Sequence, residues 1–247
     1  MNYGSLAQQL IPALENGDRL TRAEFERRYS LIPDIKKAEL IEGVVYVASP
    51  LRYNRHGKPH SQVMTWLGVY VAGTPGVELA DNATVRLDLD NEPQPDALLR
   101  LDEESGGRSR ISEDDYVEGA PELIVEIAAS SVSYDLHDKL QAYRRNGVRE
   151  YLVWLVQDRK FRWYVLDQGE YRQQQPDSLG VLTLRLRSAS TPSGAEVLSS
   201  PFLPGLRLDV QALLRGDMSR VLTVLQEGIG CPEHQAFVEE LSRTSLQ

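Results

Sequence analysis

Three residues of the chain, Asp96, Glu126 and Lys139, have side chains that could together hold and use a divalent metal ion. Glu126 lies within a nearly continuous apolar run, residues 123–129, where an unpaired carboxylate would be costly to bury. Asp96 directly follows Pro95, whose ring fixes the backbone at that point. Two carboxylates and an amine that converge are the minimum set for a metal ion that positions and activates a water molecule.

Each of these residues also has a simpler structural explanation. Glu126 could lie on an edge strand with its side chain on a wet face, and most Pro-Asp pairs are turns. Lys139 follows Asp135 by four residues, which is the spacing of an ion pair on a helix surface worth about a few tenths of a kcal/mol. The metal-site hypothesis therefore depends on the fold bringing the three side chains together.

The middle of the chain predicts the elements that would do this. Residues 123–129 are typical of a strand buried on both faces, and residues 151–156 form a second unbroken apolar run. Between them, a helix is predicted from the spacing of Leu136, Leu140 and Tyr143. Its N-cap is Ser133 or Asp135, and it ends at Asn146-Gly147, where glycine suits a left-handed position.

This strand–helix–strand order with short loops indicates a βαβ unit with two parallel strands. Its helix packs on the sheet, so a lysine in an early turn can reach toward the C-terminal half of the preceding strand. The unit thus offers a route from Lys139 to Glu126. Tyr143, one turn further along the helix, is interpreted as a core residue.

The remaining segments predict an α/β core with a mixed β-sheet. A capping box at Thr21–Glu24 predicts a short helix to about Tyr29, and Glu42-Gly43 between two β-rich runs predicts a hairpin. The other expected elements are a polar loop over 52–59, a helix over 60–71, strands over 77–80, 84–89 and 96–101, a flexible loop over 102–119, an antiparallel pair over 161–166 and 181–186, a connector over 188–194, and a strand near 206–210 before C-terminal helices.

Composition excludes several classes of protein. The 247 residues are 41% hydrophobic and 26% charged, which is typical of a globular protein. No apolar stretch approaches the roughly 20 residues of a membrane span, and residues 1–14 lack a signal pattern. One cysteine, Cys231, excludes an intramolecular disulfide and a cysteine-based zinc site. A cytoplasmic protein is expected, and the net charge of −9 disfavours nucleic acid unless a local patch supplies cations.

An ordered set of motifs gives the chain a family resemblance. The set consists of Ala38–Gly43, Ser49-Pro50, His60, Pro95-Asp96, Ala120–Ile127, Asp135 with Lys139 and Tyr143, Gly147–Tyr151 and Pro204–Leu206. In this order it resembles the Uma2 (DUF820) family, which is abundant in cyanobacteria and is assigned to the restriction-endonuclease-like PD-(D/E)XK superfamily. The resemblance runs from about Thr21 to Leu214. It implies a restriction-endonuclease-like mixed sheet flanked by helices, with an N-terminal β-hairpin extension.

The resemblance also implies roles for single residues. Asp96 and Glu126 would bind Mg²⁺ or Mn²⁺, with the backbone carbonyl of Ile127 completing the protein's share of the ligands. The superfamily lysine usually lies two residues after the second acid, where this chain has Ala128. Lys139, from the following helix, is the expected substitute.

Two further residues are auxiliary candidates. Glu39 could point toward the metal, or be a solvated hairpin residue; His60 could approach a phosphate or assist a water, or be a polar helix cap. The loop after the acidic strand departs from the family pattern, because Ala129 and Ser130 stand where Ser and Pro are common.

The leading hypothesis is a Mg²⁺-dependent endonuclease that hydrolyses phosphodiester bonds of nucleic acid, with DNA the expected substrate. The alternatives are a non-catalytic binding or interaction module on a nuclease fold, and an unrelated protein whose carboxylates are structural. We expect residues 1–215 to form the Uma2-type domain and residues 216–247 a C-terminal helical tail. A homodimer is a reasonable expectation, because many proteins of this fold dimerise.

Overall fold

A six-stranded mixed β-sheet forms the centre of the computed structural model, which describes residues 12–32, 34–129, 132–174 and 197–244. The strands lie in the order β11-β10-β9-β8-β5-β3. Only β8 and β9 are parallel, and every other neighbouring pair is antiparallel. Their bounds are Val77–Asp81 (β3), Ala97–Leu101 (β5), Leu123–Ala128 (β8), Glu150–Leu155 (β9), Lys160–Asp167 (β10) and Glu170–Gln173 (β11).

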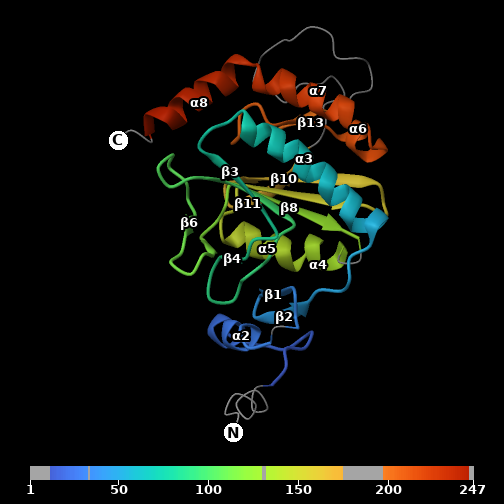
Figure 1. The fold of residues 1–247 in the computed structure, drawn as a ribbon, viewed down its shortest axis with the longest axis vertical. Coiled ribbons are helices and arrows are strands. Elements are labelled where there is room, and N and C mark those ends of the chain that lie inside the picture. The colour runs from blue at the N-terminus through green and yellow to red at the C-terminus, as the bar shows by residue number, and fades with distance from the viewer. Residues whose placement is uncertain (1–11, 33, 130–131, 175–196, 245–247) are drawn as a thin grey trace.

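Helices cover both faces of this sheet (Figure 1). One face carries the helices α3 (Lys58–Ala72), α6 (Val210–Arg215), α7 (Met218–Ile229) and α8 (Pro232–Thr244). The other carries α4 (Val132–Leu136) and α5 (Asp138–Arg145). Beyond α4 and α5 lies a third layer of α2 (Arg22–Tyr29) and a hairpin of β1 (Ala38–Ile41) and β2 (Val44–Val47).

Side chains of the central strands alternate between two apolar clusters, as the period of two in a strand requires. On β8, Leu123, Val125 and Ile127 face the α3 side. Ile124 and Ala128 face the α4–α5 side. Every residue of β8 is therefore buried, which explains why the strand reads as a continuous apolar run.

The predicted βαβ unit and hairpin are confirmed. β8 and β9 pair in parallel, with Glu126 opposite Val153. α5 ends at Arg145, with Asn146 as its C-cap and Gly147 next in the left-handed region (φ 81°). At the hairpin turn, Glu42 and Gly43 both have positive φ, 51° and 72°, the combination that a two-residue type I′ turn requires.

Several expectations about local structure need correction. The expected polar loop over 52–59 contains a single π-helical turn, η1 (Tyr53–Gly57), which runs directly into α3. The expected strand over 84–89 is only β4 (Val85–Arg86). The loop over 102–119 contains β6 (Arg110–Ile111) and β7 (Val117–Glu118), and β7 lies between β4 and β6 in a small three-stranded sheet. Such short pairings give hydrogen-bond partners to the backbone N–H and C=O groups of segments that lie outside the main sheet.

Other corrections concern partners and caps. β10 pairs with β11; the expected partner over 181–186 and the connector over 188–194 lie outside the described residues and stay predictions. Asp135 lies within α4 rather than capping α5, whose N-cap position is His137. β12 (Val197–Ser199) pairs with β13 (Arg207–Asp209), which leads into α6.

The C-terminal helices pack on the core. Val221 and Leu225 of α7 and Leu241 of α8 are buried in the same apolar cluster as Trp66 of α3. Among the described residues, no helix combines the length and apolar character that crossing a bilayer would need.

Candidate active site

Glu126 is directed by the strand alternation toward α5. It lies on β8, between β9 and β5, and is 4% exposed, so the edge-strand explanation is wrong. Its carboxylate meets two side chains from α5: Lys139 Nζ lies 2.7 Å from Oε1, and the Tyr143 hydroxyl donates to the same oxygen at 2.9 Å. The two residues are one helical turn apart, which places both on the face of α5 that packs against the sheet.

Lys139 is enclosed by acids from three elements. Besides Glu126, its Nζ lies 2.9 Å from Glu39 Oε1 on β1 and 3.9 Å from Asp135 Oδ1 on α4. The ring of Tyr134 lies 5.1 Å from the same nitrogen. Lys139 is therefore a buried ammonium with several partners, not one half of a surface pair.

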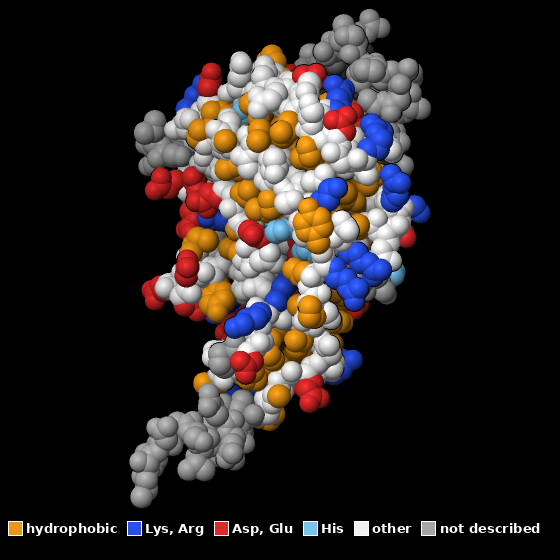
Figure 2. Space-filling model, turned by 45° about the vertical axis from the view of Figure 1, so that its right-hand side comes forward, with side chains coloured by type: hydrophobic (Ala, Val, Ile, Leu, Met, Phe, Trp, Pro, Cys, Tyr) orange, Lys and Arg blue, Asp and Glu red, His pale blue; other side chains and the backbone are white. Residues whose placement is uncertain are grey.

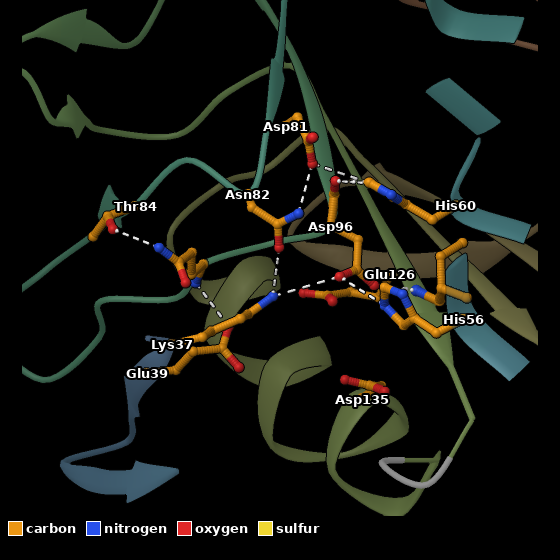
Figure 3. A network of polar contacts seen from close by, with 12 residues as sticks. Lys37, Glu39, His56, His60, Asp81, Asn82, Thr84, Asp96, Glu126 and Asp135 are labelled. Carbon is orange, nitrogen blue, oxygen red and sulfur yellow. Dashed lines mark hydrogen bonds and ion pairs between the residues drawn. The ribbon is translucent and has the colours of Figure 1, made fainter. Parts of the chain in front are cut away.

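Asp96 lies beside Glu126, immediately before the neighbouring strand β5 (Figure 3). β5 and β8 pair with Ala97 opposite Val125, so the residue before β5 comes next to Glu126. The backbone N–H of Ile127 donates to Asp96 Oδ2 at 2.7 Å, and this bond fixes the carboxylate against β8.

Lys37 and His56 contact the other carboxylate oxygen of Asp96, and His60 contacts its backbone carbonyl. His56 Nε2 lies 3.1 Å from Oδ1, and Lys37 Nζ lies 3.4 Å from it. His60 Nε2 lies 2.8 Å from the Asp96 carbonyl oxygen and 3.1 Å from Asp81 Oδ1. Figure 3 shows these side chains converging on Asp96 from the residue before β1, from η1 and from α3.

The cluster carries more negative than positive charge. Its carboxylates are Glu39, Asp96, Glu126 and Asp135, and its ammonium groups are Lys37 and Lys139. With neutral histidines this leaves two excess negative charges in a largely buried region. Such an excess is relieved by a proton or by a bound cation.

The pKa values show which groups the excess negative charge affects. Burial opposes ionisation of Asp96, but the His56 hydrogen bond and the charge of Lys37 hold its pKa well below the usual range. Burial raises the pKa of Glu126 to about 8, even with Lys139 against it. Burial also disfavours the ammonium of Lys139, yet Glu126 and Glu39 raise its pKa well above its usual value. Lys139 therefore stays protonated, and Glu126 is the group whose proton a bound cation would displace.

The donor set fits a hard divalent cation. In the part of the chain that the structure describes, no three His, Cys, Asp or Glu side chains form a ready metal cluster. Mg²⁺ does not need one, because it keeps several waters and commonly binds through one or two carboxylates plus substrate oxygens. The adjacent carboxylates of Asp96 and Glu126, with the Ile127 carbonyl predicted beside them, are a set of that kind.

The structure thus brings Asp96, Glu126 and Lys139 into one cluster, with Lys139 bound to Glu126 rather than to Asp96. Glu39 is 7% exposed and its Oε1 accepts the Gln94 N–H at 2.7 Å, so it is not a solvated hairpin residue. His60 contacts the Asp96 backbone instead of capping its helix. Ser130, part of the altered loop, lies outside the described residues.

Four residues of the cluster were not expected there. Tyr143 was interpreted as core and Asp135 as a cap, while Lys37 and His56 were assigned no role. His56 and His60 are four residues apart, a spacing that could have paired them on one helical face. Lys37 leaves no comparable signal, because its position depends on where the hairpin docks.

Comparisons with known proteins agree with this architecture. The sequence profile of the Uma2 family, described as "Putative restriction endonuclease", matches residues 22–211, and the chain belongs to this family. Among solved structures, the chain is similar to a protein from Anabaena variabilis described as "a putative nuclease belonging to DUF820", with 14% identity and a TM-score of 0.52. That similarity covers 76% of this chain and 96% of the other. No curated protein matches.

These matches confirm the predicted fold class: a mixed sheet flanked by helices, with an N-terminal hairpin, shared with a nuclease-fold neighbour.

Proposed function

We propose that the chain is a Mg²⁺- or Mn²⁺-dependent nuclease that hydrolyses phosphodiester bonds, with DNA as the expected substrate. The family description and the description of the structural neighbour support a nuclease. The observation that carries the proposal is the pair of adjacent buried carboxylates, Asp96 and Glu126, beside an ammonium held 2.7 Å from one of them. Carboxylates with a purely structural role do not require an excess of acids over ammonium groups around them.

The proposed roles follow from charge. A divalent cation, when bound, supplies Lewis acidity at the phosphoryl oxygen and a water of lowered pKa. Asp96 and Glu126 would hold it, with the Ile127 carbonyl as a third ligand. Lys139 would orient the attacking water and stabilise the negative charge that develops on the phosphate. Because its pKa is raised, it acts as a fixed positive charge and not as a base.

The auxiliary residues would tune this arrangement. Tyr143 orients Glu126 by its hydrogen bond, and Glu39 holds the ammonium of Lys139 from the hairpin side. His60 is half-buried between the Asp96 carbonyl and the exposed Asp81, where it would meet a phosphate of the substrate.

Plasmid DNA incubated with the purified protein, with Mg²⁺ and with EDTA, tests the proposal. Wild type should nick or linearise the plasmid only with metal, and Asp96→Ala and Lys139→Ala should lose this activity. Gln141→Ala, an exposed change on α5, is the control and should keep it. Equal cleavage by wild type and both site variants would refute the residue assignments. Metal binding without cleavage would favour the non-catalytic binding module.

The organisation proposed with this function is a Uma2-type domain over residues 1–215 followed by a helical tail over residues 216–247. A cytoplasmic location and a homodimer belong to the same proposal. Light scattering on the purified chain would test the dimer.

A further inference from the structure

A strongly basic surface segment borders the candidate site. In residues 51–58, Leu-Arg-Tyr-Asn-Arg-His-Gly-Lys, every residue except His56 is exposed. Tyr53 is 75% exposed and Leu51 64% exposed, among the most exposed large hydrophobic residues described. Packing within the protein does not explain why an aromatic ring is exposed to water between cations.

The cations of this segment are unneutralised. Arg52, Arg55 and Lys58 form no ion pair with any residue that the structure describes. By contrast, Arg27 and Arg172, exposed on α2 and β11, are paired with Glu24 and Asp167. In a chain of net charge −9, three adjacent cations without acids indicate an anionic partner.

His56 ties this segment to the site. η1 is a π-helical turn, in which the Gly57 N–H reaches the Arg52 carbonyl at 3.2 Å, and such turns are frequent at functional sites. Within it His56 is buried, with Nε2 3.1 Å from Asp96 Oδ1. The basic side chains before and after His56 therefore lie at the rim of the carboxylate cluster.

A neighbouring pocket extends the same surface. It has a volume of about 180 Å³ and is lined by Asn54, Lys58, Trp154, Arg159 and Arg215, among others. Arg159 and Arg215 also form no ion pair with the described residues. Trp154 lies opposite Ile127 in the β8–β9 register, so the pocket opens at the same end of β8 as the site. Figure 2 shows Lys and Arg gathered along one side of this face, beside exposed hydrophobic side chains.

We propose that these residues form a binding strip for one strand of nucleic acid. The basic strip is defined as Arg52, Tyr53, Arg55, Lys58, Arg159 and Arg215. Its cations contact successive phosphates, and Tyr53 stacks on an unpaired base. A duplex hides its base faces by stacking, so the strip favours single-stranded or locally unpaired substrate. This inference rests on the proposed function and specifies the strand that the site receives.

Binding in EDTA tests the strip without cleavage. The probe is a fluorescein-labelled single strand of about 30 nucleotides, longer than a typical site, and the comparison is a duplex of the same sequence. Arg52→Gln/Arg55→Gln/Lys58→Gln should weaken single-strand binding about tenfold or more and reduce the salt slope by about 2, since three phosphate contacts are lost. The matched control, Arg27→Gln/Arg172→Gln/Arg243→Gln, changes net charge equally at exposed sites on α2, β11 and α8, and should bind nearly as wild type.

Tyr53 gives a second readout. Tyr53→Ala should weaken binding of the single strand at least about fivefold and leave the duplex unaffected, while Tyr53→Phe should restore it. No binding of the single strand, or an equal loss in both triple variants, would overturn the strip. Tyr53→Ala binding as wild type would overturn the stacking contact.

The two proposals fail separately. If binding follows this pattern but no cleavage occurs with Mg²⁺, the strip stands and the nuclease proposal falls. If the protein cleaves DNA and the strip variant binds and cleaves as wild type does, only the strip is wrong.

Discussion

Two buried glutamates on neighbouring parallel strands differ in their surroundings. Glu126 on β8 lies among three other carboxylates and the ammonium of Lys139. Glu150 on β9 is fully buried and accepts hydrogen bonds from neutral donors, Trp163 Nε1 at 2.5 Å and the Ser200 hydroxyl. Burial raises both pKa values, to about 8 and about 7. A buried carboxylate alone therefore does not mark a site; the charges around it do.

The largest expected effect is on the free energy of unfolding, which should differ between variants at Glu126's partners and at Glu150's partners. Lys139→Met removes the cation from among three acids and should destabilise the fold by about 3–5 kcal/mol, because uncompensated charges remain buried. Trp163→Phe removes one neutral donor from Glu150 and should cost about 1–3 kcal/mol. Urea unfolding at pH 7.5 measures both. Equal losses would remove the distinction.

The second effect concerns pH. Glu150 has a folded pKa of about 7 against 4.5 unfolded, so its protonated form stabilises the fold fully below pH 4.5, and that contribution is lost as pH rises through 7. Glu150→Gln keeps an acceptor for Trp163 and removes the titration. The stability of wild type relative to this variant should fall by about 3 kcal/mol between about pH 4 and 8. A constant difference would contradict the raised pKa.

The third effect concerns activity. Glu126→Gln should reduce Mg²⁺-dependent cleavage at least about 100-fold, since a metal ligand matters at least as much as the groups that orient ligands. Glu150→Gln should cleave as wild type does. Initial rates on supercoiled plasmid measure the ratio, and a similar loss in both variants would assign Glu126 a structural role.

The smallest effect is stabilisation by metal. With Mg²⁺ at about ten times its Kd, the folded state should gain about 1.4 kcal/mol, read as a rise in Tm. Glu126→Gln and Asp96→Ala should abolish the rise and Glu150→Gln should retain it. A rise in all three variants would mean that the metal binds elsewhere.

Much of the frame could be predicted from local sequence periodicity. The apolar runs of β8 and β9, the helical spacing of α5 and the turn at Glu42-Gly43 each encode one element, and a βαβ unit leaves few ways to pack them. The approach of Lys139 to Glu126 followed from that packing. The signals of the βαβ unit lie within about 30 residues of sequence, and that of the hairpin lies within its own turn.

The rest of the cluster depends on long-range docking. Lys37 and Glu39 arrive on the hairpin, and His56 arrives through a π-helical turn that has no distinctive periodicity. Asp135 was interpreted as a cap because Asp is common at caps. Contacts of this kind are fixed by the whole fold, which a local pattern does not contain.

The N-terminal hairpin forms a small packing unit with α2 and the segment before it, whose apolar cluster includes Leu14, Phe25, Leu40 and Val45. Even so, it supplies Glu39 to the ammonium of Lys139 and Lys37 to Asp96. The charge balance of the carboxylate pair is therefore completed only when two separately packed bodies meet. A displacement of the hairpin would alter the affinity of the centre for cations without moving either strand that bears it.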